Sequence, residues 1–184
     1  MTKTRAAAAA TVLLLSLSGC GGGGDEEPSA ASKQSKDDAT ASKSIADSIL
    51  ASQKSGSGQV FTVSTKDANC IGDGLVDKLG TEKLQKYKLL DKDLKATGSL
   101  ATAKMFPPDA KSAADAFFDC TDVEAKAKSA VSKNRQLTAP IKKCVTGLLT
   151  EKTLRPFLEK TFQGRGQEAQ RDLAGPLSKC ATQR

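Results

Sequence analysis

The sequence contains no histidine and no tryptophan, and it has a single tyrosine. Histidine is the commonest general base and the commonest neutral metal ligand in proteins, so its absence excludes imidazole-dependent catalytic triads and histidine-based metal centres. None of the five cysteines lies in a Cys-x-x-Cys pair, which disfavours a thiolate metal site. We therefore expect no metal, no cofactor and no enzymatic activity.

The glycine run and the paired acidic residues supply no catalytic motif. Residues 21–24 are glycines without the Gly-Lys-Ser/Thr that completes a phosphate-binding loop. Asp115 and Asp119 are four residues apart on the polar face of a predicted helix, where solvated charges are the ordinary interpretation. Asp91 and Asp93 lack the remaining ligands of an EF-hand loop.

The first nineteen residues have the form of a signal peptide. Lys3 and Arg5 precede an apolar run, residues 6–17, that is too short to span a bilayer as a mature helix. The junction LSGC, residues 17–20, resembles the lipobox of bacterial lipoproteins. That resemblance implies cleavage after residue 19 and a diacylglyceryl group on Cys20. Two acyl chains suffice for stable anchoring, so we expect the protein on the outer face of the cell membrane.

Composition divides the rest of the chain into a tether and a domain. Residues 20–43 contain no aromatic and no large aliphatic side chain, which predicts a flexible tether because little apolar surface can be buried. Residues 44–184 hold all six phenylalanines and the tyrosine, and they are long enough for one domain.

Apolar periodicity predicts helices in this domain. Steps of three and four recur over residues 109–132, 141–148 and 154–162. The one strand candidate, residues 59–63, is too isolated to build a sheet. We expect a compact all-α bundle of about seven short helices.

Several residues predict where these helices begin and end. Ser64, Thr81 and Thr138 are candidate helix starts, Gly80 suits a helix end, and Thr121 to Glu124 forms a candidate capping box. Two prolines should disturb helices. Pro156 should lie in the first turn of its helix or kink that helix, and Gly175-Pro176 should interrupt the last helix.

Two stretches of the domain resemble each other. Cys70 and Cys144 each begin a run of Cys, an apolar residue, Gly-Leu and Thr-Glu-Lys, and each run leads to a helical pattern with a second cysteine, Cys120 or Cys180. We interpret them as diverged internal units, 44–122 and 123–184. Four cysteines in an exported chain predict two disulfides with three possible pairings. Equivalent pairing in the two units favours Cys70–Cys120 and Cys144–Cys180, and the other two pairings stay open.

The lipobox, the tether and the cysteine-closed helical units together resemble small lipoproteins of high-GC Gram-positive bacteria. This resemblance implies location and architecture only, because that group carries no agreed biochemical role.

Charge is uneven along the chain. Residues 121–184 hold 13 Lys and Arg against 6 acidic residues, whereas residues 20–120 hold 13 against 15. A basic surface facing anionic lipid or anionic wall polymer is one interpretation, and a solvated exterior is the other. Nucleic acid is not expected, because the chain is exported and lacks stacking aromatics. The candidate surface residues are Lys142, Lys143, Lys152, Arg155, Lys160, Arg165, Arg171 and Lys179.

Three functions fit these observations. The leading prediction is a membrane-anchored, non-enzymatic interaction or scaffold domain of the cell envelope, with an envelope protein as its partner. The alternative is a carrier, which requires an apolar cavity among the helices for a lipid or other small hydrophobic ligand. The third is an enzyme that works without histidine.

Overall fold

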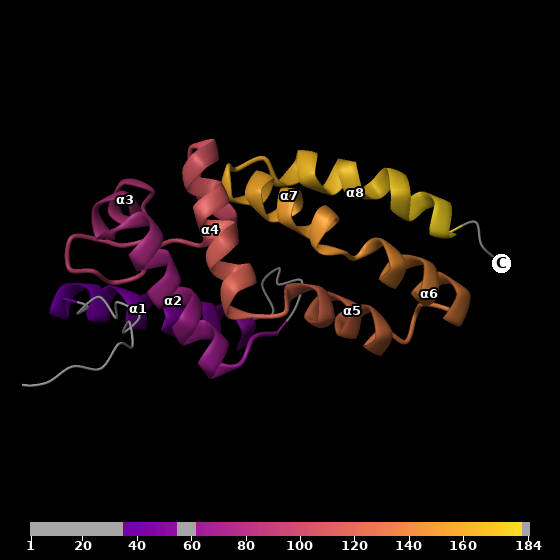
Figure 1. The fold of residues 1–184 in the computed structure, drawn as a ribbon, viewed down its shortest axis with the longest axis horizontal. Helices are drawn as coiled ribbons and strands as arrows, with labels where there is room; N and C mark the ends of the chain where they lie inside the picture. The colour runs from indigo at the N-terminus through magenta and orange to yellow at the C-terminus, as the bar shows by residue number, and fades with distance from the viewer. Residues whose placement is uncertain (1–34, 55–61, 182–184) are drawn as a thin grey trace, which may run out of the picture. The chain divides into compact units, whose positions relative to one another are not determined.

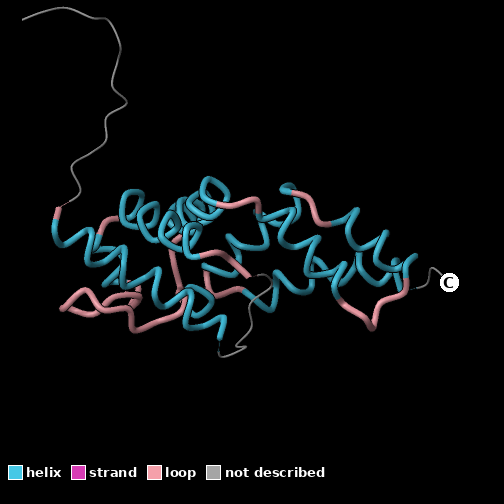
Figure 2. Tube along the Cα trace, turned by 90° about the horizontal axis from the view of Figure 1, so that it is seen from below, coloured by secondary structure: helices cyan, strands magenta, loops and turns pink. Residues whose placement is uncertain are grey.

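The computed structural model describes residues 35–54 and 62–181, and these residues belong to one compact unit. Cys20, the lipobox and residues 20–34 of the predicted tether lie outside the described residues. Within the described residues the fold is all-α, as predicted, with eight α-helices rather than about seven and with no strand (Figures 1 and 2). The elements are α1 (Lys36–Lys54), α2 (Thr65–Leu79), α3 (Thr81–Lys86), the 3₁₀ helix η1 (Leu100–Thr102), α4 (Pro107–Cys120), α5 (Val123–Lys133), α6 (Ala139–Leu148), α7 (Glu151–Phe162) and α8 (Gly166–Ala181).

The predicted boundary between tether and domain at residue 43 is wrong. Helix α1 begins at Lys36, and Ala41 and Ser42 are buried against the rest of the domain. The apolar face in this first part consists of small side chains, which a search for large aliphatic residues overlooks. Small residues matter here because Gly72 of α2 lies so close to α1 that a methyl group on it would overlap the carbonyl oxygen of Ser42.

Four predicted helix ends are confirmed, and one of them is Thr81, the first residue of α3. Ser64 caps α2: its Oγ accepts from the backbone amide of Asp67 at 3.1 Å, and the Asp67 carboxylate accepts from the backbone amide of Ser64 at 3.1 Å. Gly80 ends α2 with a φ of 76°, a conformation that favours glycine. Thr138 is the N-cap residue of α6.

Among the other expectations about helix ends, those at Thr121 and Pro176 are wrong, and that for Pro156 leaves a kink in its helix as the prediction. Asp122, not Thr121, caps α5, because its carboxylate accepts from the backbone amide of Ala125 at 2.7 Å. Pro156 lies inside α7, beyond the first turn. Helix α8 continues through Pro176. The carbonyl that loses its intrahelical donor belongs to Asp172, an exposed residue, so water can replace that hydrogen bond.

Both predicted disulfides are confirmed. Cys70 of α2 bonds to Cys120 at the end of α4, and Cys144 of α6 bonds to Cys180 near the end of α8. The Cα atoms are 5.5 Å apart in each pair. Each disulfide therefore joins the second helix of a predicted unit to the last helix of that unit.

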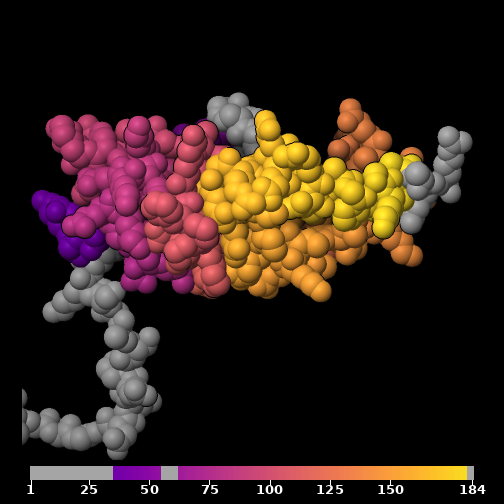
Figure 3. Space-filling view, turned by 90° about the horizontal axis from the view of Figure 1, so that it is seen from above, coloured from indigo at the N-terminus to yellow at the C-terminus, as the bar shows by residue number. Residues whose placement is uncertain are grey.

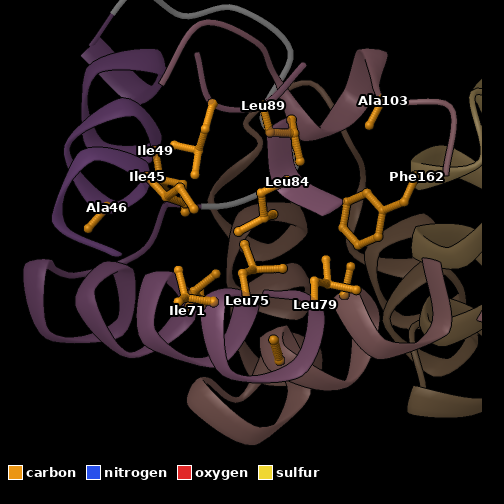
Figure 4. Packing of buried hydrophobic residues seen from close by; sticks show 14 of the residues in the cluster. Ile45, Ala46, Ile49, Ile71, Leu75, Leu79, Leu84, Leu89, Ala103 and Phe162 are labelled. Carbon is orange, nitrogen blue, oxygen red and sulfur yellow. The ribbon is translucent and has the colours of Figure 1, made fainter. Parts of the chain in front are cut away.

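The larger core joins both predicted units. Helices α1 and α2 pack together, and α4 lies between α2 and α7. In Figure 4, Ile45 and Ile49 of α1 point toward the side chains of α2 and α3, and Phe162 of α7 enters the same core. The surfaces of α7 and α8 adjoin that of α4 in the space-filling view (Figure 3).

A smaller core lies among α5, α6 and α7. Its buried members are Val123, Ala127, Leu149 and Leu154, and none of the α6 residues is buried. Helix α7 contributes to both cores, since Leu158 packs against each of them. No helix of the described part has the length and apolarity needed to cross a membrane.

Candidate functional site

A cavity of about 630 Å³ lies at the junction of α1, α7, α8 and the segment that contains η1. Its volume falls within the range of about 300 to 1,000 Å³ that is usual for small-molecule sites. Helices α2 and α4 complete its walls with Leu75 and Phe117. Residues from both predicted units therefore form this single site.

The inner part of the cavity is apolar. Ile45 and Ile49 are one helical turn apart on α1, so both side chains lie on the same face. Phe162 reaches the cavity from the end of α7, and its ring centroid lies 5.5 Å from that of Phe117. Six lining residues in this part are buried: Ile45, Ile49, Val63, Leu75, Leu89 and Phe162.

The outer part of the cavity is polar and opens to solvent, so the cavity is not closed. Among the described residues that line it, none is charged; the polar ones carry hydroxyl or amide groups. The Thr161 hydroxyl donates to the Phe157 carbonyl oxygen at 2.8 Å, and the Thr102 hydroxyl donates to the Ser99 carbonyl oxygen at 2.9 Å. The rim is therefore neutral, and part of its hydrogen-bond donor capacity is satisfied by the protein.

A second hollow, of about 670 Å³, lies at the junction of α4 and α5. Its acidic residues have partners within the domain: Asp119 pairs with Lys78 at 2.9 Å, and Asp122 caps α5. Glu124 accepts from Lys128 and from the backbone amide of Glu151, and these hydrogen bonds lower the pKa of its carboxyl group. Within residues 35–54 and 62–181, no group of three acidic or cysteine side chains is arranged to hold a metal ion.

Three of the eight residues predicted for the basic surface are held in ion pairs. Arg155 pairs with Glu151 at 2.7 Å and with Asp115, and its guanidinium carbon lies 4.4 Å from the centroid of the Phe118 ring. Lys160 pairs with Glu168 at 3.0 Å and with Asp172, and Arg165 pairs with Glu168 at 2.6 Å.

The other five basic residues differ in environment. Lys142 is half-buried and donates to the carbonyl oxygen of Ser132 at 2.9 Å. The remaining four, Lys143, Lys152, Arg171 and Lys179, are exposed. The excess of positive charge in the sequence therefore overstates the charge that is available for a partner.

The paired aspartates of α4 take part in ion pairs that join helices. Asp115 pairs with Lys111 on its own helix at 3.0 Å and with Arg155 of α7. Burial acts to raise the pKa of Asp115, but the hydrogen bonds and positive charges of Lys111 and Arg155 outweigh burial and hold that pKa below its usual value. Asp115 and Asp119 face different partners and form no pair with each other in the structure.

One polar cluster was not foreseen from the sequence. The Tyr87 hydroxyl donates to Asp109 at 2.5 Å, and Lys83 pairs with the other carboxylate oxygen at 2.8 Å. Burial and the hydrogen bond to Asp109 raise the pKa of Tyr87, whereas the hydrogen bonds from Lys83 and Tyr87 lower the pKa of Asp109. Phe106 beside them is 59% exposed, with Lys86 Nζ 5.4 Å from its ring centroid.

The cavity, too, was foreseen only as a possibility. The spacing of Ile45 and Ile49 identifies one of its walls, but nothing in the sequence of residues 96–102 marks that segment as another. No protein-family model, no curated protein and no solved structure matches this chain.

Proposed function

We propose that this protein is a membrane-anchored extracytoplasmic lipoprotein whose helical domain binds a small apolar ligand. The observation that supports this proposal is the cavity of about 630 Å³ with its buried aliphatic and aromatic inner part. A carrier needs such a cavity and a plain scaffold does not. We therefore favour the carrier function over the interaction function that the sequence predicts.

The chemistry of the cavity suits this role. Each methylene group that leaves water for an apolar site contributes about 0.8 kcal/mol, so a short alkyl chain gains substantial affinity from Ile45, Leu75 and Phe162. The walls belong to helices that are joined by disulfides, ion pairs and core packing. A site of this kind loses little conformational entropy on binding.

The anchor part of the proposal depends on Cys20. Its position at the end of the apolar leader, after Leu17-Ser18-Gly19, supports lipid attachment at that thiol. Replacing Cys20 with serine removes the acceptor, and we expect the exported protein to lose its association with the membrane fraction. An intact mass that differs from that of the unsubstituted protein only by the exchange of sulfur for oxygen, together with unchanged membrane association, would contradict the anchor without affecting the cavity.

Ligand binding is tested by native mass spectrometry of the full-length protein, produced in a host that exports it and keeps its disulfides oxidised. We expect an added mass that disappears on denaturation. Ser48→Trp would fill the cavity from α1 and abolish the added mass. Ala51→Trp is the matched control, because Ala51 is exposed on the same helix and does not line the cavity. A bare mass for the unsubstituted protein, and no uptake of added alkyl probes, would contradict the carrier.

A second function is favoured by Phe106. This aromatic ring is 59% exposed and has a lysine over its face, and exposed aromatic residues of this kind often carry the binding energy of protein interfaces. An interaction domain would use it to contact an envelope protein. In-cell cross-linking from position 106 should then capture one defined partner, and Phe106→Ala should abolish capture from a neighbouring cross-linking position.

A further inference from the structure

We propose that the cavity selects an uncharged, single-chain amphiphile whose polar end is a hydroxyl group, and that it rejects the carboxylate of the same chain length. This inference rests on the proposed function, because it names the class of ligand for the same site. Three features support it: the lack of charge among the described lining residues, the direction of two hydroxyl hydrogen bonds at the rim, and the ion pairs of two nearby cations.

The described lining offers no cation to an incoming anion. None of the described lining residues is charged, and the inner part is formed by Ile45, Ile49 and Leu75 among other apolar residues. A carboxylate that is drawn toward the apolar inner part loses water and gains no cation in return, which is unfavourable. An alcohol of the same length avoids this penalty because it is neutral.

Hydrogen bonds within the protein leave acceptors at the rim. The hydroxyl protons of Thr161 and Thr102 are donated to carbonyl oxygens of their own segments at 2.8 and 2.9 Å. A threonine whose proton is already donated has only oxygen lone pairs left to offer. An ionised carboxylate is itself only an acceptor, so it gains nothing from these two oxygens, whereas an alcohol can donate to them.

Two of the cations close in sequence to the rim, Lys160 and Arg165, have anionic partners. Lys160 precedes Thr161 and is held by Glu168 at 3.0 Å and by Asp172. Arg165 precedes the lining residue Gly166 and pairs with Glu168 at 2.6 Å. An incoming carboxylate would have to displace a protein carboxylate to reach either of them.

The experiment compares 1-dodecanol with dodecanoate at pH 8, using the oxidised full-length protein stripped of bound lipid. These probes share one chain length and differ in the charge of the polar end. We expect 1-dodecanol to bind tighter by about tenfold or more, since an unsatisfied buried polar group costs about 1 to 3 kcal/mol. Equal affinity, or tighter binding of dodecanoate, would overturn this inference and leave the carrier intact. If neither of these probes binds, and no other alkyl probe binds, the carrier function itself is overturned.

Two variants locate the polar end of the ligand. Thr161→Lys places a cation at the rim and should shift the preference toward dodecanoate by about tenfold. Thr161→Val keeps the shape but removes the acceptor, and it should weaken 1-dodecanol by about fivefold. Thr146→Val is the matched control, because Thr146 of α6 also donates to the carbonyl four residues earlier but lies outside the cavity. An unchanged alcohol-to-carboxylate ratio in both Thr161 variants would contradict the assignment.

Discussion

The backbone amide of Met105 donates a hydrogen bond of 2.9 Å to the carbonyl oxygen of Phe162. Met105 precedes α4 and Phe162 is the last residue of α7, so this bond joins the two units that the sequence predicts. The Phe162 side chain is buried in the larger core, against Phe117. The second half of the chain thus completes the core of the first, and the cavity forms at the place where they meet.

Replacement of Phe162 by alanine should destabilise the domain by about 3 to 5 kcal/mol, because it removes a buried ring and leaves a cavity. Chemical denaturation followed by circular dichroism measures this loss. Phe106→Ala is the control: its ring is 59% exposed, so we expect a change within about 0.5 kcal/mol. Equal losses for the two variants would mean that Phe162 does not belong to the shared core.

Gly72→Ala should destabilise the domain by about 1 to 3 kcal/mol, because the new methyl group would overlap the Ser42 carbonyl oxygen and force α1 away from α2. Gly147→Ala on α6 meets no atom within 4 Å, so it should be neutral or stabilise by up to about 1 kcal/mol through helix propensity. Thermal melts of both variants decide between these outcomes. A neutral Gly72→Ala would contradict the close packing of α1 on α2.

Loss of the two disulfides should affect the protection of backbone amides from solvent exchange differently. By the chain-entropy model each loop, of 50 or 36 residues, contributes about 4 kcal/mol. Helix α6 has no buried residue, so after replacement of Cys144 and Cys180 by serine its amides should exchange with solvent much faster. Helix α2 has six buried residues, so it should stay protected after the same change at Cys70 and Cys120. Hydrogen exchange read by mass spectrometry tests this contrast, and equal protection of α6 with and without its disulfide would refute it.

Asp109 should contribute to acid sensitivity. The hydrogen bonds from Lys83 and Tyr87 hold the pKa of Asp109 below its ordinary value of 3.8. A carboxyl whose pKa is lower in the folded state stabilises the fold above that ordinary value, and this contribution is lost as the pH falls through the folded pKa.

Asp109→Asn should therefore lower stability at neutral pH by about 1 to 2 kcal/mol and flatten the pH dependence of unfolding below about pH 4. Urea denaturation at a series of pH values measures both effects. Asp47→Asn is the control, because Asp47 and its partner Lys43 are both exposed on α1. An unchanged slope in the acid range for Asp109→Asn would show that this ion pair does not form in solution.

Much of the local structure could be predicted because it depends on neighbouring residues. Ser64 and Asp67 satisfy each other within one turn, and Gly80 adopts a positive φ that few residues tolerate. The start of α1 was missed because its buried face is made of Ala41 and Ser42, whose burial depends on a glycine in another helix.

At Pro176 and at the junction of α4 and α5, too, the local sequence pattern predicts the helix ends wrongly. A proline usually ends a helix, but the exposed position of Asp172 on α8 lets water replace the missing hydrogen bond. Thr121 and Asp122 are both good capping residues, but Thr121 is the buried C-cap residue of α4, and Asp122 caps α5. Exposure and burial are properties of the packed domain, which a local pattern does not contain.

The sequence by itself determined the helical class and several helix ends, and it favoured the cysteine pairing that the structure shows, because periodicity, capping and the repeated units are encoded over short stretches. Only the tertiary structure decided which cations pair with carboxylates and where the cavity lies. Both depend on contacts such as Met105 with Phe162 and Asp115 with Arg155, between residues far apart in the chain. Such contacts form when apolar faces are buried together, and their geometry is set by the packing of all the helices at once.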